Sequence, residues 1–240
     1  MILCDKRILV VGASSSLGEQ IALSCIDEGA TVIATKYKSS KEHLLSGSTC
    51  ISLQSLDVRN ENAISDFVES LKALDGVVLT VGSPCLRNLK SERYDHIEEY
   101  LKVGFTGLAT LISYLVKYKK LNSHSSIVIL SSISGVVVGS KGGSLYSATK
   151  AALCGFMKSA ALELAPQYIR VNCICAGIVN TPALHDTFSS EMIANFSLSY
   201  PLGRLGTTKD IAQASVFLLS DNSDWITGTE LIIDGGYCLQ

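Results

Sequence analysis

The sequence lacks the features of several large classes of protein. A net charge of −2 over 240 residues gives no basic footprint for nucleic acid or for an anionic membrane surface. No uninterrupted apolar stretch reaches the length of a membrane span, and Asp5, Lys6 and Arg7 precede a short strand rather than the apolar core of a secretory signal. The chain also shows no linker, repeat or low-complexity segment. We therefore expect one folded domain over residues 1–240, with neither nucleic acid nor membrane as a partner.

The eight cysteines form no metal-binding or redox motif. They are scattered along the chain, and only Cys173 and Cys175 lie close together. On a strand these two would point to one face and Ile174 to the other. We expect no metal site, and buried, reduced thiols in a protein of the cytoplasm.

What the sequence does contain is an alternation of strand and helix patterns in a chain that is 47% hydrophobic and 18% charged. The patterns predict strands over 7–11, 31–35, 50–56, 75–80, 126–131, 169–175 and 230–233, and helices over 17–28, 61–72, about 94–119, 145–165 and 208–219. Such alternation favours right-handed crossovers and an α/β fold, with a doubly wound parallel sheet covered by helices on both faces. The segment 181–206 has little strand pattern, and we expect it to form a loop that caps the crevice at the strand ends.

Tyr146 and Lys150 are spaced for chemistry on one face of a helix. Residues four apart share a helix face, and apolar residues follow at helical spacing as far as Leu164. At about 4 Å and an effective dielectric of roughly 20, an ammonium attracts a phenolate by about 4 kcal/mol. Such a charge can lower the pKa of the phenol by roughly 1–3, which makes it a usable general acid or base. The alternative is an exposed tyrosine and lysine at the start of an ordinary helix.

A glycine-bearing turn follows the first predicted strand. The apolar run 8–11 leads into segment 12–18 (GASSSLG), after which a helical pattern begins. Strand, glycine turn and helix in this order form the context of a dinucleotide site. Gly12 can take the tight turn, Gly18 permits close helix–strand approach, and the helix N-terminus offers N–H groups to a pyrophosphate. A plain strand-to-helix turn is the alternative.

Two more strands end in segments that suit a binding site. Ser131 and Ser132 follow the apolar run 127–130, and another strand breaks at Gly177. Ligands of open α/β sheets bind at the carboxyl ends of the strands. Ordinary turn chemistry would also explain both patterns.

Taken together, these residues resemble the short-chain dehydrogenase/reductase family, in its short single-domain branch. The resemblance extends from Arg7 to Gly236 and includes the C-terminal pattern PLGRLGTTKDIAQASVFLLSDNSDWITGTELIIDGG at 201–236. It implies a Rossmann-like fold and an NAD(P)-dependent oxidoreductase.

The resemblance assigns roles to individual positions. Tyr146 would be the catalytic acid or base, Lys150 would lower its pKa and bond the nicotinamide ribose, and Ser132 would polarise the substrate oxygen. The positions that match the family's cofactor contacts are Gly12, Ser14, Ser15, Leu17 and Gly18 in the first turn, Asp57 and Val58 after the third strand, Gly82 after the fourth, and Gly177, Ile178 and Thr181 after the sixth.

Several positions depart from the family pattern. Ser16 replaces a glycine, Val11 a threonine and Ala176 a proline, while Leu79-Thr80-Val81-Gly82 replaces Asn-Asn-Ala-Gly. The sharpest departure is Gly104, where the family usually has an asparagine that helps to hold a relay water. We expect water to fill the vacated space and activity to be retained; the alternatives are reduced activity and a cofactor-binding chain without catalysis.

The end of the second strand bears on the choice of cofactor. NAD-selective members place an acidic residue there, but this chain reads Thr35-Lys36-Tyr37-Lys38. A lysine can bind a phosphate as a point charge, so Lys36 and Lys38 favour NADP (NADPH) over NAD. The alternative is that these lysines belong to a solvated loop.

The sequence does not single out one substrate. The closest-looking activity is that of 3-oxoacyl-carrier-protein reductases, which implies a small-molecule or carrier-linked ketone. Alternatives are a sugar or secondary-metabolite ketone, or a non-catalytic cofactor-binding regulator. Leu184, Phe188, Met192 and Phe196 suggest an apolar lid, but they could equally pack on the scaffold.

The two longest predicted helices carry apolar or small residues on nearly every face. Such helices need cover on both sides. The resemblance implies pairing of these helices across one two-fold axis and of the tail 225–240 across another, so we expect a homotetramer or homodimer.

Overall fold

The computed structural model describes residues 1–37, 51–82 and 86–240. In this part of the chain, seven strands form one sheet in the order β3-β2-β1-β4-β5-β6-β7, and every neighbouring pair is parallel. The strands are β1 (Arg7–Val11), β2 (Thr31–Lys36), β3 (Ile51–Ser55), β4 (Leu74–Leu79), β5 (Leu121–Ser132), β6 (Arg170–Ala176) and β7 (Glu230–Ile233). The predicted parallel α/β sheet is therefore confirmed; Cys50, the first residue of the predicted third strand, lies outside the described residues.

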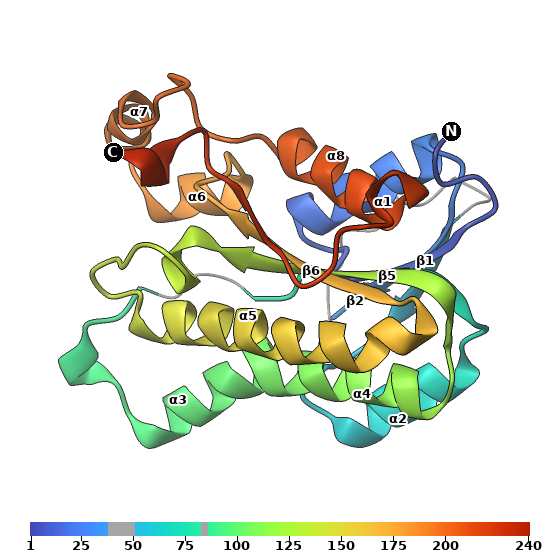
Figure 1. The fold of residues 1–240 in the computed structure, drawn as a ribbon. Helices are drawn as coiled ribbons and strands as arrows, with labels where there is room; N and C mark the ends of the chain where they lie inside the picture. The colour runs from blue at the N-terminus through green and yellow to red at the C-terminus, as the bar shows by residue number, and fades with distance from the viewer. Residues whose placement is uncertain (38–50, 83–85) are drawn as a thin grey trace.

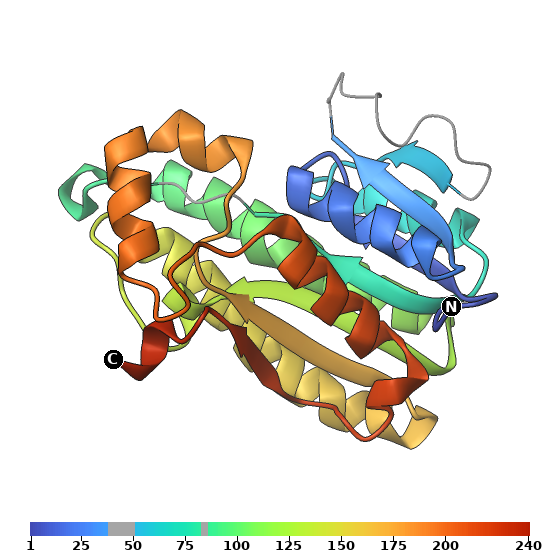
Figure 2. The same cartoon turned by 90° about the horizontal axis from the view of Figure 1, so that it is seen from above.

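The helices lie on both faces of this sheet (Figure 1). They are α1 (Ser16–Asp27), α2 (Glu61–Ser70), α3 (Tyr94–Leu101), α4 (Gly107–Lys117), α5 (Ser144–Leu164), α6 (Pro182–Thr187), α7 (Ser190–Leu198) and α8 (Thr208–Leu219). Short 3₁₀ helices span Leu89–Ser91, Ile133–Gly135, Ala165–Gln167, Asp221–Ser223 and Tyr237–Leu239. Helices α1 and α8 cover one face side by side, as Figure 2 shows from above, and α2, α4 and α5 cover the other.

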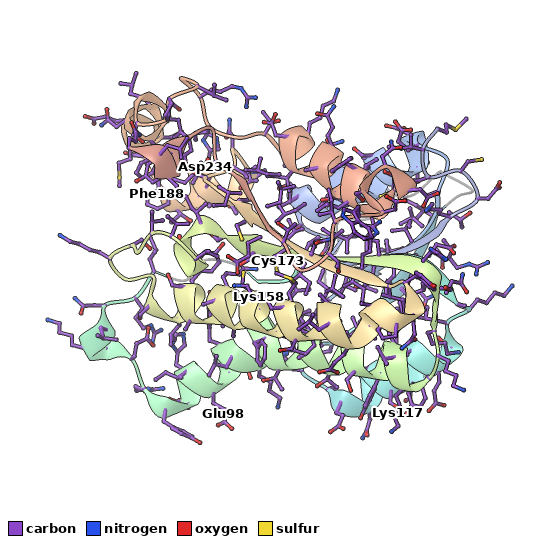
Figure 3. The ribbon with its side chains drawn as sticks, viewed as in Figure 1. Glu98, Lys117, Lys158, Cys173, Phe188 and Asp234 are labelled. Atoms are coloured by element: carbon purple, nitrogen blue, oxygen red, sulfur yellow. The ribbon has the colours of Figure 1, made fainter. Side chains whose placement is uncertain are left out.

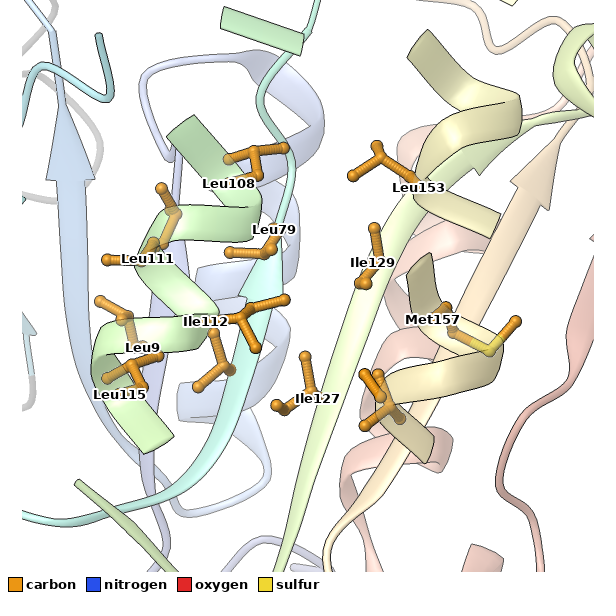
Figure 4. Close-up of a cluster of buried hydrophobic side chains, with 14 of the residues drawn as sticks. Leu9, Leu79, Leu108, Leu111, Ile112, Leu115, Ile127, Ile129, Leu153 and Met157 are labelled. Carbon is orange, nitrogen blue, oxygen red and sulfur yellow. The ribbon is translucent and has the colours of Figure 1, made fainter. Parts of the chain in front are cut away.

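Each face of the sheet buries its own apolar core. Cys173 and Cys175 belong to the core under α4 and α5, while Ile174 between them belongs to the core under α1 and α8. Alternate side chains of a strand point to opposite faces, so a strand buried on both sides reads as a continuous apolar run. Figure 4 shows the first core, in which leucines of α4 meet Leu79 and Ile127 of the sheet, and Leu153 and Met157 project from α5.

Two predicted elements differ from the structure. The predicted helix over 94–119 is interrupted by a π-helical turn at Lys102–Thr106, between α3 and α4. A π turn changes the hydrogen-bond spacing without changing which residues are apolar, so side-chain periodicity does not reveal it. The predicted loop 181–206 instead contains α6 and α7, which are too short to produce a clear periodic pattern.

The strand order places a cleft between β1 and β4. The chain runs outward from β1 through β2 and β3, then returns to the other side of β1 as β4. Open α/β sheets bind ligands at such a reversal, beyond the carboxyl ends of the strands. Val11 and Leu79 are register partners at the ends of these two strands. In the described residues, no helix is long and apolar enough to cross a membrane.

Candidate active site and cofactor cleft

Lys150 is buried at the centre of the candidate active site. Its side chain projects from α5 towards the end of β5, where Nζ donates a hydrogen bond of 2.7 Å to the carbonyl oxygen of Leu130. Nζ also lies 5.8 Å from the centre of the Tyr146 ring. Burial lowers the pKa of Lys150 from its ordinary value of 10.5 to about 8. The pKa of Lys150 therefore lies close to neutral pH, because burial disfavours the ammonium form.

Tyr146 lies one turn before Lys150 on α5, partly buried beside Ser132. Burial raises the pKa of the Tyr146 phenol, and hydrogen bonding with Ser132 acts in the opposite direction. The expected lowering of the Tyr146 pKa by Lys150 is not among the causes of its shift, which are burial and Ser132, and the Lys150 Nζ bonds the Leu130 carbonyl oxygen. Burial thus favours the neutral form of the phenol.

Ser132 is fixed by the backbone around it. Its Oγ lies 3.3 Å from the carbonyl oxygen of Ala176, its register partner on β6, and accepts a bond of 3.2 Å from the N–H of Ser134. The 3₁₀ turn that follows packs tightly on α5: a Cβ added at Gly135 would lie 2.7 Å from the backbone nitrogen of Ala151. Gly135 therefore lets the Ser132 loop approach the helix that carries Tyr146 and Lys150, a role that sequence reasoning missed.

The first glycine turn has the geometry that a dinucleotide requires. Gly12 has a φ of +89°, which favours glycine, and a Cβ on Gly18 would lie 2.5 Å from the Gly12 carbonyl oxygen. Thr80 helps to fill the space left by the missing side chains, and its Oγ1 donates 2.8 Å to the carbonyl oxygen of Val11. The Ser15 side chain caps α1 by accepting a bond from the Gly18 N–H. A pyrophosphate at this helix N-terminus fits these residues.

A cavity of about 540 Å³ opens from this turn along the ends of β1, β2 and β4. The predicted cofactor residues that line it are Gly12, Ser14, Ser15, Lys36, Asp57, Val58 and Gly82. At the inner end, Gly82 has a φ of +120°, and an added Cβ there would lie 3.3 Å from Lys150 Nζ. The cavity therefore reaches from the glycine turn towards the buried lysine.

Seven other predicted cofactor residues lie outside the lining of this cavity: Leu17, Gly18, Tyr146, Lys150, Gly177, Ile178 and Thr181. Leu17 packs against the core under α1 and α8. Gly177 follows β6 and packs against Asp234, the Ile178 N–H donates 2.7 Å to the Tyr200 hydroxyl, and Thr181 precedes α6. Tyr200, which sequence reasoning missed, thus orients the loop that was predicted to hold the nicotinamide end.

Arg59 is a third residue that sequence reasoning missed. It lines the cavity, where its guanidinium binds both carboxylate oxygens of Asp57 at 2.9 Å and Glu99 Oε1 at 3.0 Å. It also donates to the Tyr37 hydroxyl and stacks on that ring at 4.6 Å. These bonds to Asp57 and Glu99 raise the pKa of Arg59 above its ordinary value. The local sequence around Arg59 does not predict this contact, because Glu99 lies on α3, far along the chain. Lys38 lies outside the described residues.

The position of a Cβ at Gly104 is crowded by another side chain. A Cβ at Gly104 would lie 3.0 Å from Thr149 Cγ2 and 3.1 Å from Thr149 Cβ. Thr149 is held by a bond of 2.8 Å from its Oγ1 to the Tyr146 carbonyl oxygen. Thr149 therefore crowds the position of a Cβ at Gly104, although both residues also line the cavity, and the expectation of water beside Gly104 stays a prediction.

The apolar residues of segment 183–200 mostly pack on one another. Leu184, Phe188 and Phe196 join a small core with Ile193 and Tyr200, and the rings of Phe188 and Phe196 meet edge to face at 5.2 Å. Figure 3 places Phe188 and Asp234 at the end of the molecule where α6 and α7 lie. Met192, by contrast, is exposed. This segment therefore has a small apolar core of its own and is not a loose loop.

The arrangement groups two hydroxyl side chains, those of Tyr146 and Ser132, beside Lys150, whose Nζ approaches the inner end of the cleft at Gly82. Ser132, Tyr146 and Lys150 come from neighbouring elements and lie among buried groups. A phenol that keeps its proton can protonate a developing alkoxide, and a serine hydroxyl can stabilise the same oxygen. In the described residues there is no cluster of His, Cys, Asp and Glu that could hold a metal ion.

Comparisons with known proteins agree with this geometry. A family model described as enoyl-(acyl carrier protein) reductase matches residues 12–238. Dehydrogenase/reductase SDR family member 6 of Rattus norvegicus is 28% identical over 239 residues, covering 98% of each chain. The 3-oxoacyl-(acyl-carrier-protein) reductase FabG of Thermotoga maritima is 33% identical over 253 residues, 98% of this chain and 99% of that one. The structure of ElxO with NADP bound has 29% identity and a TM-score of 0.88, covering 98% of this chain and all of that one.

Proposed function

The chain belongs to the short-chain dehydrogenase/reductase family of NAD(P)-dependent oxidoreductases, and from this premise we propose that it reduces a ketone to a secondary alcohol with NADPH. The observation that carries the proposal is the grouping of Ser132, Tyr146 and buried Lys150 next to Gly82, which lines the inner end of the cleft and approaches Lys150 Nζ. A bound nicotinamide would supply the hydride. The glycine turn at 12–18 and the residues Asp57, Val58 and Gly82 would hold the dinucleotide, with Gly177, Ile178 and Thr181 towards its nicotinamide end.

Each active-site residue has a separate task in this proposal. Tyr146 donates its phenolic proton to the carbonyl oxygen as negative charge develops there. Ser132 donates a hydrogen bond to the same oxygen. Lys150, with a pKa of about 8, lies close to the working range of a proton carrier and would bond the nicotinamide ribose.

We propose a 3-oxoacyl thioester as the substrate class. The similarity to a 3-oxoacyl reductase supports it. A second cavity of about 460 Å³ also supports it, because its lining residues are uncharged: Val137, Val138, Ser199, Tyr237, Cys238 and Gln240. Such a lining suits a neutral chain better than a phosphorylated sugar. A neutral sugar or secondary-metabolite ketone remains the second candidate, since hydroxyl and amide groups are also present there.

Consumption of NADPH tests the proposal. The purified protein is mixed with NADPH and with matched 3-oxoacyl thioesters, neutral keto-sugars and simple ketones. Turnover with the thioesters at least about tenfold above the sugars in kcat/KM supports the substrate class. The reverse order would favour the second candidate. Tight binding of NADPH without turnover of any ketone would instead indicate a cofactor-binding regulator.

We also propose that the chain assembles as a homotetramer or homodimer through α4, α5 and the C-terminal segment. Large apolar side chains are exposed on α5 and on the C-terminal segment, with Leu162 at 79% and Trp225 at 96%. A second copy would remove them from water.

A further inference from the structure

Two carboxylates and one guanidinium meet at the outer end of the cofactor cleft. Arg59 binds Asp57 through Nε and Nη2, binds Glu99 through Nη1, and donates to the hydroxyl of Tyr37. All four residues line the same cavity. Tyr37 directly follows the end of β2, the place where dinucleotide folds distinguish a ribose 2′-hydroxyl from a 2′-phosphate.

The charge at this end depends on Arg59. With its guanidinium in place, Asp57 and Glu99 are both paired with a cation. Without it, two carboxylates would face the cleft where the adenosine half of the cofactor must lie. Carboxylates accept a hydrogen bond from a 2′-hydroxyl and repel a phosphate. The two ion pairs of Arg59 are of unequal strength. The pair with Asp57 is bidentate, whereas Glu99 makes a single bond and is half exposed.

We propose that Arg59 selects the cofactor. Its guanidinium shields the two carboxylates and donates to the 2′-phosphate of NADPH. Glu99 competes with that phosphate for the guanidinium. This inference rests on the proposed function, because it assumes that a nicotinamide dinucleotide occupies the cleft. Arginine suits the task, since its planar fork of N–H groups matches a phosphate and keeps its charge at every working pH.

Direct binding measurements on four variants test the proposal without any need for turnover. Dissociation constants for NADPH and NADH are measured by calorimetry for wild type, Arg59→Gln, Arg59→Lys, Glu99→Gln and Arg93→Gln. Arg93 is the matched control: it pairs with one carboxylate, Asp95, on the exposed surface, and it does not line the cavity. Its loss removes the same unit of charge from the protein.

We expect Arg59→Gln to lower the ratio of NADPH to NADH affinity by about tenfold to a hundredfold, the range for one hydrogen bond to a charged group. Arg59→Lys should fall between this variant and wild type. Glu99→Gln should tighten NADPH and leave NADH nearly unchanged, and this variant keeps the proposal testable if Arg59→Gln does not fold. Arg93→Gln should behave as wild type.

Equal effects of Arg59→Gln and Arg93→Gln would overturn the proposal, since they would reflect net charge alone. Weaker NADPH binding by Glu99→Gln would overturn it as well. A wild-type protein that binds neither dinucleotide would overturn both the proposed function and this inference. Normal binding by wild type with no effect of Arg59→Gln would overturn this inference alone.

Discussion

Lys150 Nζ lies 2.7 Å from the carbonyl oxygen of Leu130, so the lysine of α5 is anchored to the end of β5. Leu130 is followed directly by Ser131 and Ser132, and the Ser131 hydroxyl donates back to the Lys150 carbonyl at 3.0 Å. Helix and strand are thus joined by reciprocal bonds at the residues proposed for catalysis. The buried lysine is the source of the first prediction.

The stability of the cofactor-free protein should depend on pH through Lys150. Its pKa is about 8 in the folded chain and 10.5 ordinarily, so the unfolded chain binds more protons between these values. The free energy of unfolding should therefore rise with pH across this window, by about 3 kcal/mol in total, with the lysine's destabilising effect fully present below pH 8. Chemical denaturation of wild type and Lys150→Met at several pH values isolates the effect. Parallel curves for the two proteins would contradict it.

The contact between Gly104 and Thr149 predicts a rescue. Gly104→Asn alone should lower the free energy of unfolding by about 1–3 kcal/mol, because its Cβ would crowd Thr149. Adding Thr149→Ser removes the γ-methyl group but keeps the hydroxyl that bonds Tyr146, and should restore most of the loss. Thermal and urea denaturation of both variants, with Thr149→Ser as control, measure this. A Gly104→Asn variant with the stability of wild type would contradict this prediction, because it would mean that Thr149 moves aside at no cost.

The sequence was a good guide to the fold because buried parallel strands leave continuous apolar runs such as that of β1, which its pattern placed correctly. The prediction that Tyr146 and Lys150 lie one turn apart on one helix is also confirmed, because that spacing follows from helix geometry alone. Arg59 could not be predicted as a cleft residue, since its partner Glu99 is brought to it by tertiary structure. The crowding of Gly104 by Thr149 escaped prediction for the same reason: Thr149 belongs to another helix.

Salt should weaken the preference for NADPH. Lys36 lines the cleft at the end of β2, and attraction between exposed charges is screened as ionic strength rises. NADPH should bind more tightly than NADH, and the gap should narrow with added salt and in Lys36→Ala. Calorimetric titrations at low and high salt test this. A preference for NADH at low salt would refute the expected selectivity. If Lys36→Ala keeps the wild-type ratio of NADPH to NADH affinity, Lys36 does not contribute to the selectivity.

Assembly should depend on the exposed face of α5. Leu162 is 79% exposed there, and Leu162→Glu should shift the mass measured by light scattering at micromolar concentration from that of two or four subunits towards a smaller species. Leu89→Glu serves as the control, because Leu89 is 71% exposed but lies on a separate 3₁₀ turn. A wild-type mass of one subunit would refute assembly. A mass of two subunits would mean that only one of the two proposed interfaces forms.

The central claim is that Tyr146 protonates a ketone, and the Tyr146→Phe variant tests it most directly. This change removes the phenolic proton and keeps the ring that packs near Lys150. We expect the rate of NADPH-dependent ketone reduction to fall by at least about two orders of magnitude, while the dissociation constant for NADPH stays within about twofold of wild type. Turnover by Tyr146→Phe close to the wild-type rate would contradict the account.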